Sequence, residues 1–339
     1  MQRYTVTSGQ GIEGLRRGDL APPALQFHET RVRVAAASLN YRDLIIADGQ
    51  YLPPSHPIFV PLSDGAGEVV EVGDTVTRFR PGDRVVASFW PSWIDGPMTA
   101  AKTAVSLGFG QDGFLAETFT YTEGAFVAAP RTLSMAEAST LPCAGVTAWN
   151  ALFVEGRLKP GASVLILGTG GVALWALQLA VAAGCRAILL SSSDEKLGRA
   201  KALGAADTLN YRTTPEWQHN VLALTNGEGV DLVVEVGGQG TLARSIEAVR
   251  VGGTVVVIGG LSGFGDAGIG PGMLIGGAKR LVGVSVGSRA MLEDLVRFVD
   301  VAGIKPVVHK TFAFGAAADA YAALKSGTHL GKIVVNVAN

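Results

Sequence analysis

One stretch of the chain, residues 163–184, restricts the possible folds more than any other. Ser163–Leu167 is a continuous apolar run that is too short for a helix. A glycine-rich turn, residues 168–173, follows it, and an apolar helical segment then extends from about Gly171 to Gly184. A buried strand, a glycine-rich turn and a long helix in this order predict a βα unit of a parallel sheet.

The same alternation continues along the chain. Apolar runs predict further strands at residues 187–190, 231–236, 254–258 and 281–286, and helical segments at 194–203, 241–249 and 291–301. Strands that are apolar on both faces need helices on both sides of the sheet. The sequence therefore predicts an α/β domain with a doubly wound parallel sheet.

The first third of the chain has a different pattern. Short alternating or apolar segments at 30–36, 66–73 and 85–89 are bounded by Gly, Pro and Asp, which is typical of a compact antiparallel β fold. Residues 90–113 are less regular and are interpreted as a long loop over a site or a subunit contact. The segment 331–337 is expected to be a strand that returns to this first domain, so the parallel sheet is an insertion.

The composition excludes several classes of protein. Of the 339 residues, 48% are hydrophobic and 17% charged, a balance opposite to that of a disordered chain. A net charge of -1 argues against a nucleic-acid partner. The apolar runs are too short to cross a bilayer, and the chain starts without an apolar leader. Cys143 and Cys185 suggest a reducing compartment, so a soluble cytoplasmic protein is expected.

The glycine-rich turn has the pattern G-x-G-x-x-A, a form of the dinucleotide-binding fingerprint. Gly168 permits the tight turn, Gly170 lets the backbone approach a pyrophosphate, and Ala173 keeps the helix close to the sheet. The helix N-terminus offers free N–H groups to the anion. A βα turn without a ligand is the alternative, but the surrounding βαβ pattern favours binding. The predicted contacts are Gly168, Thr169, Gly170, Gly171 and Val172.

The end of the second strand indicates which nicotinamide cofactor binds. An NAD site places Asp or Glu there to bind the ribose 2′-hydroxyl. This chain instead has Ser191, Ser192 and Ser193, with Lys196 on the next helix, and Tyr211 with Arg212 follows further on. Hydroxyls and a cation favour a 2′-phosphate, and therefore NADPH. The alternative is that the serines only cap the helix and Lys196 is solvated.

Several blocks of residues resemble one family. Several segments are similar, in order, to the motifs of quinone oxidoreductases: residues 39–44 with 49–51, 64–73, 79–85, 141–149, the Rossmann segment and 329–332. These zinc-independent, zeta-crystallin-like proteins belong to the medium-chain dehydrogenase/reductase superfamily. The resemblance implies a GroES-like, mainly β catalytic domain at 1–128 and 300–339, with a Rossmann domain at 129–299 inserted into it. It also implies a homodimer, formed through the strand near residues 281–286.

The sequence departs from the zinc-dependent members of that superfamily. The positions that match the catalytic zinc ligands carry Asn40, Ser63 and Cys143. One thiolate cannot form the three-ligand site that zinc catalysis needs. No metal is therefore expected, and Cys143 is interpreted as a small buried residue beside the nicotinamide.

The resemblance also implies further site residues. Tyr51 is the first candidate for proton donor or substrate orienter, Asn40 is a hydrogen-bond partner for a carbonyl or the cofactor amide, and Tyr41 is a second tyrosine within reach. Each could instead only pack, and solvent could supply the proton. Asp43 with Arg42 is expected to form a local ion pair. Further predicted cofactor contacts are Thr147, Val236, Ile258, Gly259, Ser285, Val286 and Lys332.

A site without a metal favours an acceptor that delocalises its own negative charge. The sequence therefore predicts an NADPH-dependent oxidoreductase whose small-molecule substrate is an apolar quinone or α,β-unsaturated carbonyl. A metal-free alcohol dehydrogenase or ketone reductase is the nearest alternative. A protein that holds NADPH without turnover is the alternative from another class.

Overall fold

Strand β3 (Glu29–Leu39) lies at the centre of the first compact unit in the computed structural model, which describes residues 1–51 and 56–338. Its buried and accessible residues alternate from Thr30 to Val34, so one face packs into the core. The main sheet has the order β10-β6-β5-β3-β18-β17, and β9 also pairs with β3. The other strands of this sheet are β5 (Asp64–Val72), β6 (Arg84–Ala87), β9 (Thr118–Thr122), β10 (Phe126–Ala128), β17 (Val308–Ala313) and β18 (Lys332–Asn336).

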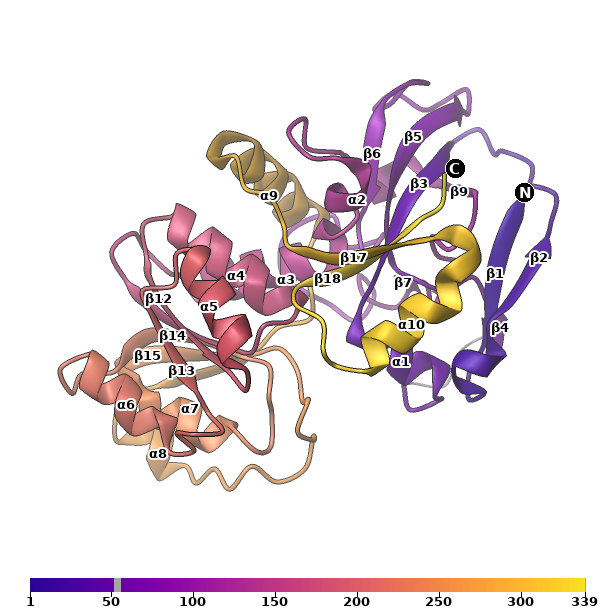
Figure 1. The fold of residues 1–339 in the computed structure, drawn as a ribbon. Coiled ribbons are helices and arrows are strands. Elements are labelled where there is room, and N and C mark those ends of the chain that lie inside the picture. The colour runs from indigo at the N-terminus through magenta and orange to yellow at the C-terminus, as the bar shows by residue number, and fades with distance from the viewer. Residues whose placement is uncertain (52–55, 339) are drawn as a thin grey trace. The chain divides into compact units, whose positions relative to one another are not determined.

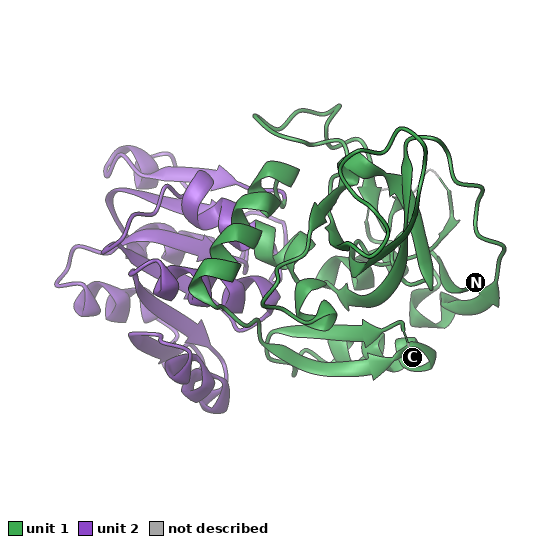
Figure 2. Ribbon diagram, turned by 90° about the horizontal axis from the view of Figure 1, so that it is seen from above, with its two compact units in different colours: residues 1–146, 286–339 green, residues 147–285 purple. Residues whose placement is uncertain are grey.

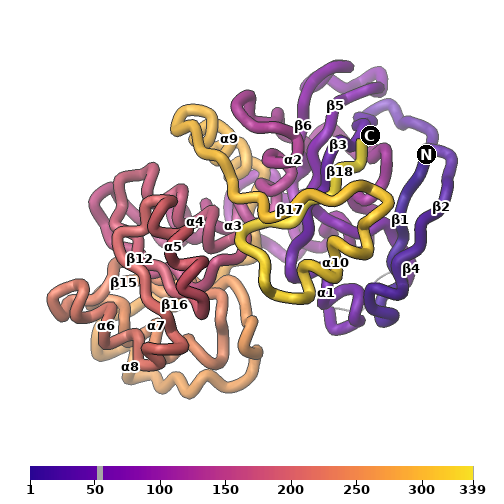
Figure 3. Tube along the Cα trace, viewed as in Figure 1, coloured from indigo at the N-terminus to yellow at the C-terminus, as the bar shows by residue number. Residues whose placement is uncertain are grey.

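Segments from both ends of the sequence build this unit. Strand β18 lies within the segment 331–337 that the sequence predicted as a returning strand. It pairs antiparallel with β3, and Figure 3 shows it running beside β17. A smaller sheet has the order β2-β1-β4. The remaining elements are β1 (Gln2–Thr7), η1 (Gly11–Gly14), β2 (Arg16–Asp19), α1 (Tyr41–Ala47), β4 (Ile58–Phe59), β7 (Ser106–Leu107), β8 (Gly110–Gln111), η2 (Glu123–Ala125), α2 (Met135–Ala138), η3 (Leu141–Gly145), α9 (Arg289–Ala302), η5 (Phe314–Ala316) and α10 (Ala317–Lys325).

The second unit is built on a parallel sheet with the order β13-β12-β11-β14-β15-β16. Residues of its central strands are almost completely buried, because helices α4 and α5 cover one face and α6 and α7 the other (Figure 1). Its elements, with α3 at its border, are α3 (Val146–Trp149), η4 (Asn150–Val154), β11 (Ser163–Leu167), α4 (Gly171–Ala182), β12 (Arg186–Ser191), α5 (Asp194–Ala202), β13 (Asp207–Asn210), α6 (Trp217–Leu224), β14 (Val230–Glu235), α7 (Leu242–Ala248), β15 (Val249–Val257), α8 (Gly272–Ile275) and β16 (Arg280–Gly283).

The strand order of the second unit places its binding edge. In chain order the strands run outward from β11 to β13 on one side and from β14 to β16 on the other. The order therefore reverses between β11 and β14. Open parallel sheets bind ligands at the carboxyl ends of the strands at such a switch point.

The chain passes from one compact unit to the other at residues 146/147 and 285/286, as Figure 2 shows. The domain boundaries expected from the sequence lie instead at 128/129 and 299/300. The difference arises because α2, η3 and α9 pack with the first unit. Helix α9 is held there at both ends. The Asp300 carboxylate accepts hydrogen bonds from the backbone of Arg131 and Thr132, and the N–H of Arg289 donates to Trp93.

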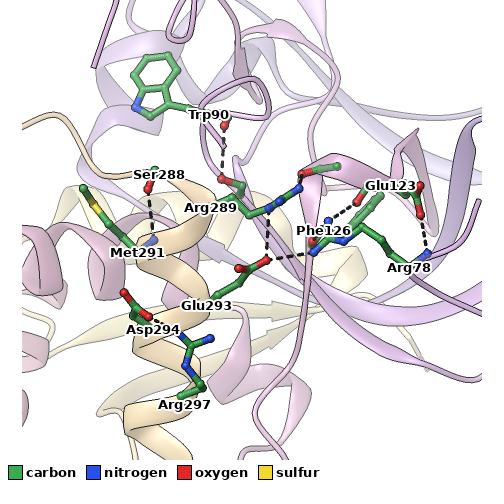
Figure 4. Close-up of polar contacts among 12 residues, drawn as sticks. Arg78, Trp90, Glu123, Phe126, Ser288, Arg289, Met291, Glu293, Asp294 and Arg297 are labelled. Atoms are coloured by element: carbon green, nitrogen blue, oxygen red, sulfur yellow. Dashed lines mark hydrogen bonds and ion pairs between the residues drawn. The ribbon is translucent and has the colours of Figure 1, made fainter. Parts of the chain in front are cut away.

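A cluster of charged residues secures the start of α9 (Figure 4). The Glu293 carboxylate pairs with Arg78 at 3.0 Å and with Arg289 at 3.3 Å. Arg289 also donates to the carbonyl of Gly124, and the backbone N–H of Arg78 donates to the Glu123 carboxylate. Helix α9 is therefore tied to the turn between β9 and β10.

Some elements differ from the sequence expectations. The strand expected at 281–286 ends at Gly283, and Val286 has a φ of 59°, which is rare for a β-branched residue. Residues 90–113, expected to be a long loop, contain the short strands β7 and β8, and Trp90 and Trp93 within this segment are buried. Strand β13 and helix α6 were not expected. Among the described residues, no helix is long and apolar enough to cross a membrane.

Candidate active site

The turn after β11 has the geometry that its glycines predict. Gly168 has a φ of 83°, a conformation that side chains disfavour, and Gly170 precedes the first residue of α4. A Cβ on Gly170 would meet no atom within 4 Å, so space is open beside this backbone. Thr169, Gly171 and Val172 complete the turn and the first residues of α4. The N–H groups at the start of this twelve-residue helix are available for an anion.

The predicted 2′-phosphate contacts meet at the ends of β12 and β13. Ser191 pairs in register with Asn210, and its carbonyl accepts from the N–H of Tyr211. Ser193 caps α5, because its hydroxyl accepts from the N–H of Lys196. The structure thus assigns the capping role to Ser193, while Ser191, Ser192, Lys196 and Tyr211 gather at the same edge. Partial burial lowers the pKa of Lys196 below its ordinary value, against the opposing charge of Glu195.

Val236 and Ile258 directly follow β14 and β15, so both lie at the binding edge, and Gly259 follows Ile258. Sequence reasoning missed Glu235, the last residue of β14. Its side chain is fully buried, and its carboxylate accepts hydrogen bonds from the N–H groups of Gly237 and Gly238 and from Thr241 and Ser245. The sequence signal that could have identified Glu235 is an acidic residue at the end of a buried apolar strand. Glu235 shapes the loop after β14.

Thr147 and Ser285 are the first and last residues of the second unit, and Val286 begins the return to the first unit. Thr147 and Val286 are buried. Their contact with a cofactor stays a prediction.

In the first unit, Lys332 and Asn40 come together. The Lys332 ammonium is buried, and it donates to the carbonyl of Leu39 and to Oδ1 of Asn40, each at 2.6 Å. Its nitrogen also lies 3.7 Å from Oδ2 of Asp64, a fully buried carboxylate. Sequence reasoning assigned Lys332 to the cofactor and gave no role to Asp64. An acid at the start of a buried strand was the signal for Asp64.

The Asp64 carboxylate organises the residues around Lys332. The Ser63 hydroxyl donates to its Oδ1 at 2.8 Å, and the backbone N–H of Cys143 donates to its Oδ2 at 3.3 Å. The hydroxyl of Ser38 lies 3.4 Å from Oδ2. The three positions that match zinc ligands therefore lie around one cluster, which we call the Asp64 cluster (Asn40, Ser63, Asp64, Cys143 and Lys332).

A second buried carboxylate lies beside this cluster. Asp43, in the first turn of α1, accepts a 2.7 Å hydrogen bond from the N–H of Asn40. Burial raises the pKa of Asp43 to about 6, although the Arg42 charge and this hydrogen bond oppose the rise. Arg42 does not form the expected ion pair. Its guanidinium donates to Ser106 at 2.8 Å and lies 4.5 Å from the ring centre of Phe89.

The two candidate tyrosines differ in their surroundings. Tyr41 is exposed on α1, in a position that favours solvent contact. Tyr51 is partly buried, and its ring packs edge-on against Phe109 at 5.0 Å, with the Arg42 guanidinium 5.4 Å from its centre. Tyr51 therefore packs against an aromatic ring and a guanidinium, and its part in proton transfer stays a prediction.

Two family models match the chain. One, "Alcohol dehydrogenase GroES-like domain", covers residues 26–131, and the other, "Zinc-binding dehydrogenase", covers residues 171–300. A "zinc-type alcohol dehydrogenase-like protein" of Schizosaccharomyces pombe is 43% identical over 93% of both chains. A quinone oxidoreductase of Pseudomonas aeruginosa is 30% identical over 98% of this chain and 99% of its own.

A solved structure from Sinorhizobium meliloti 1021 superposes with a TM-score of 0.91 at 44% identity, and 99% of each chain is covered. The two units and the dinucleotide edge define an oxidoreductase that uses a nicotinamide cofactor. The chain belongs to the medium-chain dehydrogenase/reductase superfamily, with a GroES-like unit and an inserted Rossmann unit.

The zinc of that superfamily does not fit the Asp64 cluster. Oδ1 of Asn40 is bonded to an ammonium, and the Ser63 hydroxyl donates to a carboxylate. Cys143 is the one sulfur ligand in the cluster, and burial, together with the Asp64 charge, raises the pKa of its thiol to about 12. Among the described residues, no group of three or more His, Cys, Asp or Glu side chains could hold a metal. A cation of the chain itself already balances the buried carboxylate.

Proposed function

We propose that this oxidoreductase uses NADPH to reduce quinones or α,β-unsaturated carbonyls without zinc. The Asp64 cluster carries the proposal, because Lys332 supplies the positive charge among residues that match a zinc site. An alkoxide without a metal is poorly stabilised, whereas a quinone or enone spreads the charge it gains. The relatives include a 2-methylene-furan-3-one reductase of Solanum lycopersicum, 30% identical over 99% of this chain.

The cofactor proposal rests on the edge of the Rossmann unit. When bound, the reduced nicotinamide supplies a hydride. Gly168 and Gly170 leave room for the pyrophosphate, and Ser191, Ser192 and Lys196 offer hydroxyls and a cation to a 2′-phosphate. One similar solved structure is an NAD-dependent alcohol dehydrogenase, which is 32% identical with a TM-score of 0.90 and full coverage of both chains. The test must therefore compare NADPH with NADH.

The reaction balances with one hydride and one proton. The acceptor takes a hydride from NADPH and a proton from Tyr51 or from water. An enone becomes a saturated ketone, a quinone becomes a hydroquinone, and NADPH becomes NADP⁺. Asn40 orients the acceptor oxygen.

Initial rates of cofactor oxidation test the proposal. Purified enzyme is given NADPH or NADH with 9,10-phenanthrenequinone, 2-cyclohexenone or cyclohexanone. We expect oxidation of NADPH with the quinone or the enone, at least about tenfold slower oxidation with NADH, and none with cyclohexanone, because a loss of one charge-assisted contact is worth roughly 1.4 kcal/mol or more. Turnover with cyclohexanone alone would instead identify a ketone reductase. Tight NADPH binding without oxidation by any acceptor would identify a non-catalytic protein.

A further inference from the structure

The position of the Lys332 ammonium determines the orientation of the neighbouring amide. An ammonium group can only donate hydrogen bonds, so the side-chain atom of Asn40 that lies 2.6 Å from it must be the oxygen. The amide nitrogen of Asn40, Nδ2, then points to the other side of the amide group. Lys332 therefore decides which end of Asn40 is presented to a ligand.

That nitrogen is buried and has no hydrogen-bond partner among the described residues. A buried donor without a partner destabilises a folded protein by about 1–3 kcal/mol. A buried donor in this state calls for an explanation, such as a catalytic role or a bound group that supplies the acceptor. Nδ2 has two N–H bonds, so it can serve a ligand that presents an oxygen with free lone pairs.

The rest of the Asp64 cluster holds Lys332 in place. Its second donated bond goes to the carbonyl of Leu39, the last residue of β3, which is paired in register with Ile333 next to Lys332. The Asp64 carboxylate balances the charge, and it is itself held by Ser63 and the backbone of Cys143. Lys332 has little freedom to turn away from Asn40.

We infer that Lys332 is a positioning residue, which directs Nδ2 of Asn40 to the carbonyl oxygen of the acceptor and strengthens that donor. The ammonium withdraws electron density from Oδ1, which makes the N–H bonds of the same amide better donors. A carbonyl oxygen becomes more negative as hydride is added to the conjugated system, so this donor stabilises the transition state more than the bound substrate. The inference rests on the proposed function and names the residue that acts through Asn40.

A double-mutant cycle isolates this effect. Lys332→Met alone would leave the Asp64 charge buried without its partner, so Asp64→Asn is used as the reference and Asp64→Asn with Lys332→Met as the test. We expect the test variant to lose about 10–100-fold in kcat with 2-cyclohexenone relative to the reference, at an unchanged KM for NADPH. In an Asn40→Ala background, the same removal of Lys332 should change kcat by less than about threefold. Equal losses in both backgrounds would overturn the inference.

Asn40→Asp provides a second variant, in case the doubly substituted protein does not fold. Aspartate keeps an oxygen for Lys332 and replaces Nδ2 by an oxygen, so the fold gains a carboxylate partner while the donor is lost. We expect a melting temperature close to that of the native protein and a kcat at least about tenfold lower. An undiminished kcat in this folded variant would contradict the inference.

A spectroscopic readout separates this inference from the proposed function. With asparagine labelled by ¹⁵N, the side-chain resonances of Asn40 are assigned by their absence in Asn40→Ala. Addition of 2-cyclohexenone without reduced cofactor should shift them downfield in Asp64→Asn and leave them unmoved when Lys332→Met is added. No shift in either protein would overturn the inference. A shift in an enzyme that reduces none of the three acceptors would support the role of Lys332 and reject the proposed function.

Discussion

A lysine and an aspartate buried side by side persist only when their hydrogen-bonding atoms find partners. Lys332 and Asp64 meet this condition through Leu39, Asn40, Ser63 and the backbone of Cys143. One atom in the group, Nδ2 of Asn40, lacks a partner, which distinguishes it from a purely structural network. At the residue scale, the unsatisfied donor is the feature that points to a ligand.

Asp43 makes the stability of the enzyme depend on pH. Its pKa rises from 3.8 in the unfolded chain to about 6 in the fold, because burial disfavours the charged form. The folded state therefore binds this proton more tightly. Its stabilising contribution is complete below pH 4 and is lost as the pH rises through 6. The loss amounts to roughly 3 kcal/mol.

Asp43→Asn tests this dependence by urea unfolding at pH 4.5 and 7.5. Asparagine has no charge to desolvate and can still accept from the N–H of Asn40. Relative to the native protein, the variant should become more stable by roughly 2 kcal/mol on going from pH 4.5 to pH 7.5, since the rest of the effect lies below pH 4.5. Asp48→Asn, at the exposed end of the same helix, serves as the control and should show no such gain. If the free energy of unfolding differs between Asp43→Asn and the native protein by the same amount at both pH values, Asp43 is not the source of the pH dependence.

At the scale of elements, the two glycines of the turn between β11 and α4 have different roles: Gly168 is needed for the fold, and Gly170 is needed only for binding. Gly168 needs its positive φ for the turn itself, whereas Gly170 has a φ of -77°, which any residue adopts. A Cβ at Gly170 meets nothing in the protein. Any importance of that position therefore comes from a ligand that approaches the backbone.

Gly170→Ala is expected to leave the melting temperature unchanged within about 2 °C, since it removes no contact and adds no strain. It should weaken NADPH binding at least about tenfold, because a methyl group keeps the pyrophosphate from the α4 N–H groups. Isothermal titration calorimetry gives the affinity. Gly198→Ala, which also meets open space but lies within α5, is the control. Equal NADPH affinity in native protein and Gly170→Ala would place the pyrophosphate elsewhere.

Local pattern was enough to predict most of the Rossmann elements, since short apolar runs and the glycine turn report on each strand and helix separately. Strand β13 was not predicted because Asp207–Asn210 carries three polar residues and is only half-buried. The hydrogen bond between Asn40 and Lys332 could not be predicted from the sequence for a different reason. The residues are 292 positions apart, and nothing in either segment alone reveals the partner.

At the scale of the whole molecule, β16 is expected to be the contact of a homodimer. It is an edge strand of the described parallel sheet, and Leu281 on it is 37% exposed. An edge strand offers unpaired backbone groups to a second strand. Sedimentation velocity should give twice the chain mass, and Leu281→Lys should shift the mass toward one chain. Val301→Lys, at an exposed position near the end of α9, should stay dimeric. If the native protein sediments as a monomer, the predicted homodimer is wrong.

The joining of β3 with β18 also constrains the order of events at the ribosome. The Rossmann unit is translated entirely between Asn40 and Lys332. At about 5–20 residues per second, the nascent first half waits roughly 15–60 seconds for the strand that completes it. During that interval residues 36–39 of β3 present an open hydrogen-bonding edge. A chaperone that shields this edge would raise the yield of enzyme without altering any property of the finished protein.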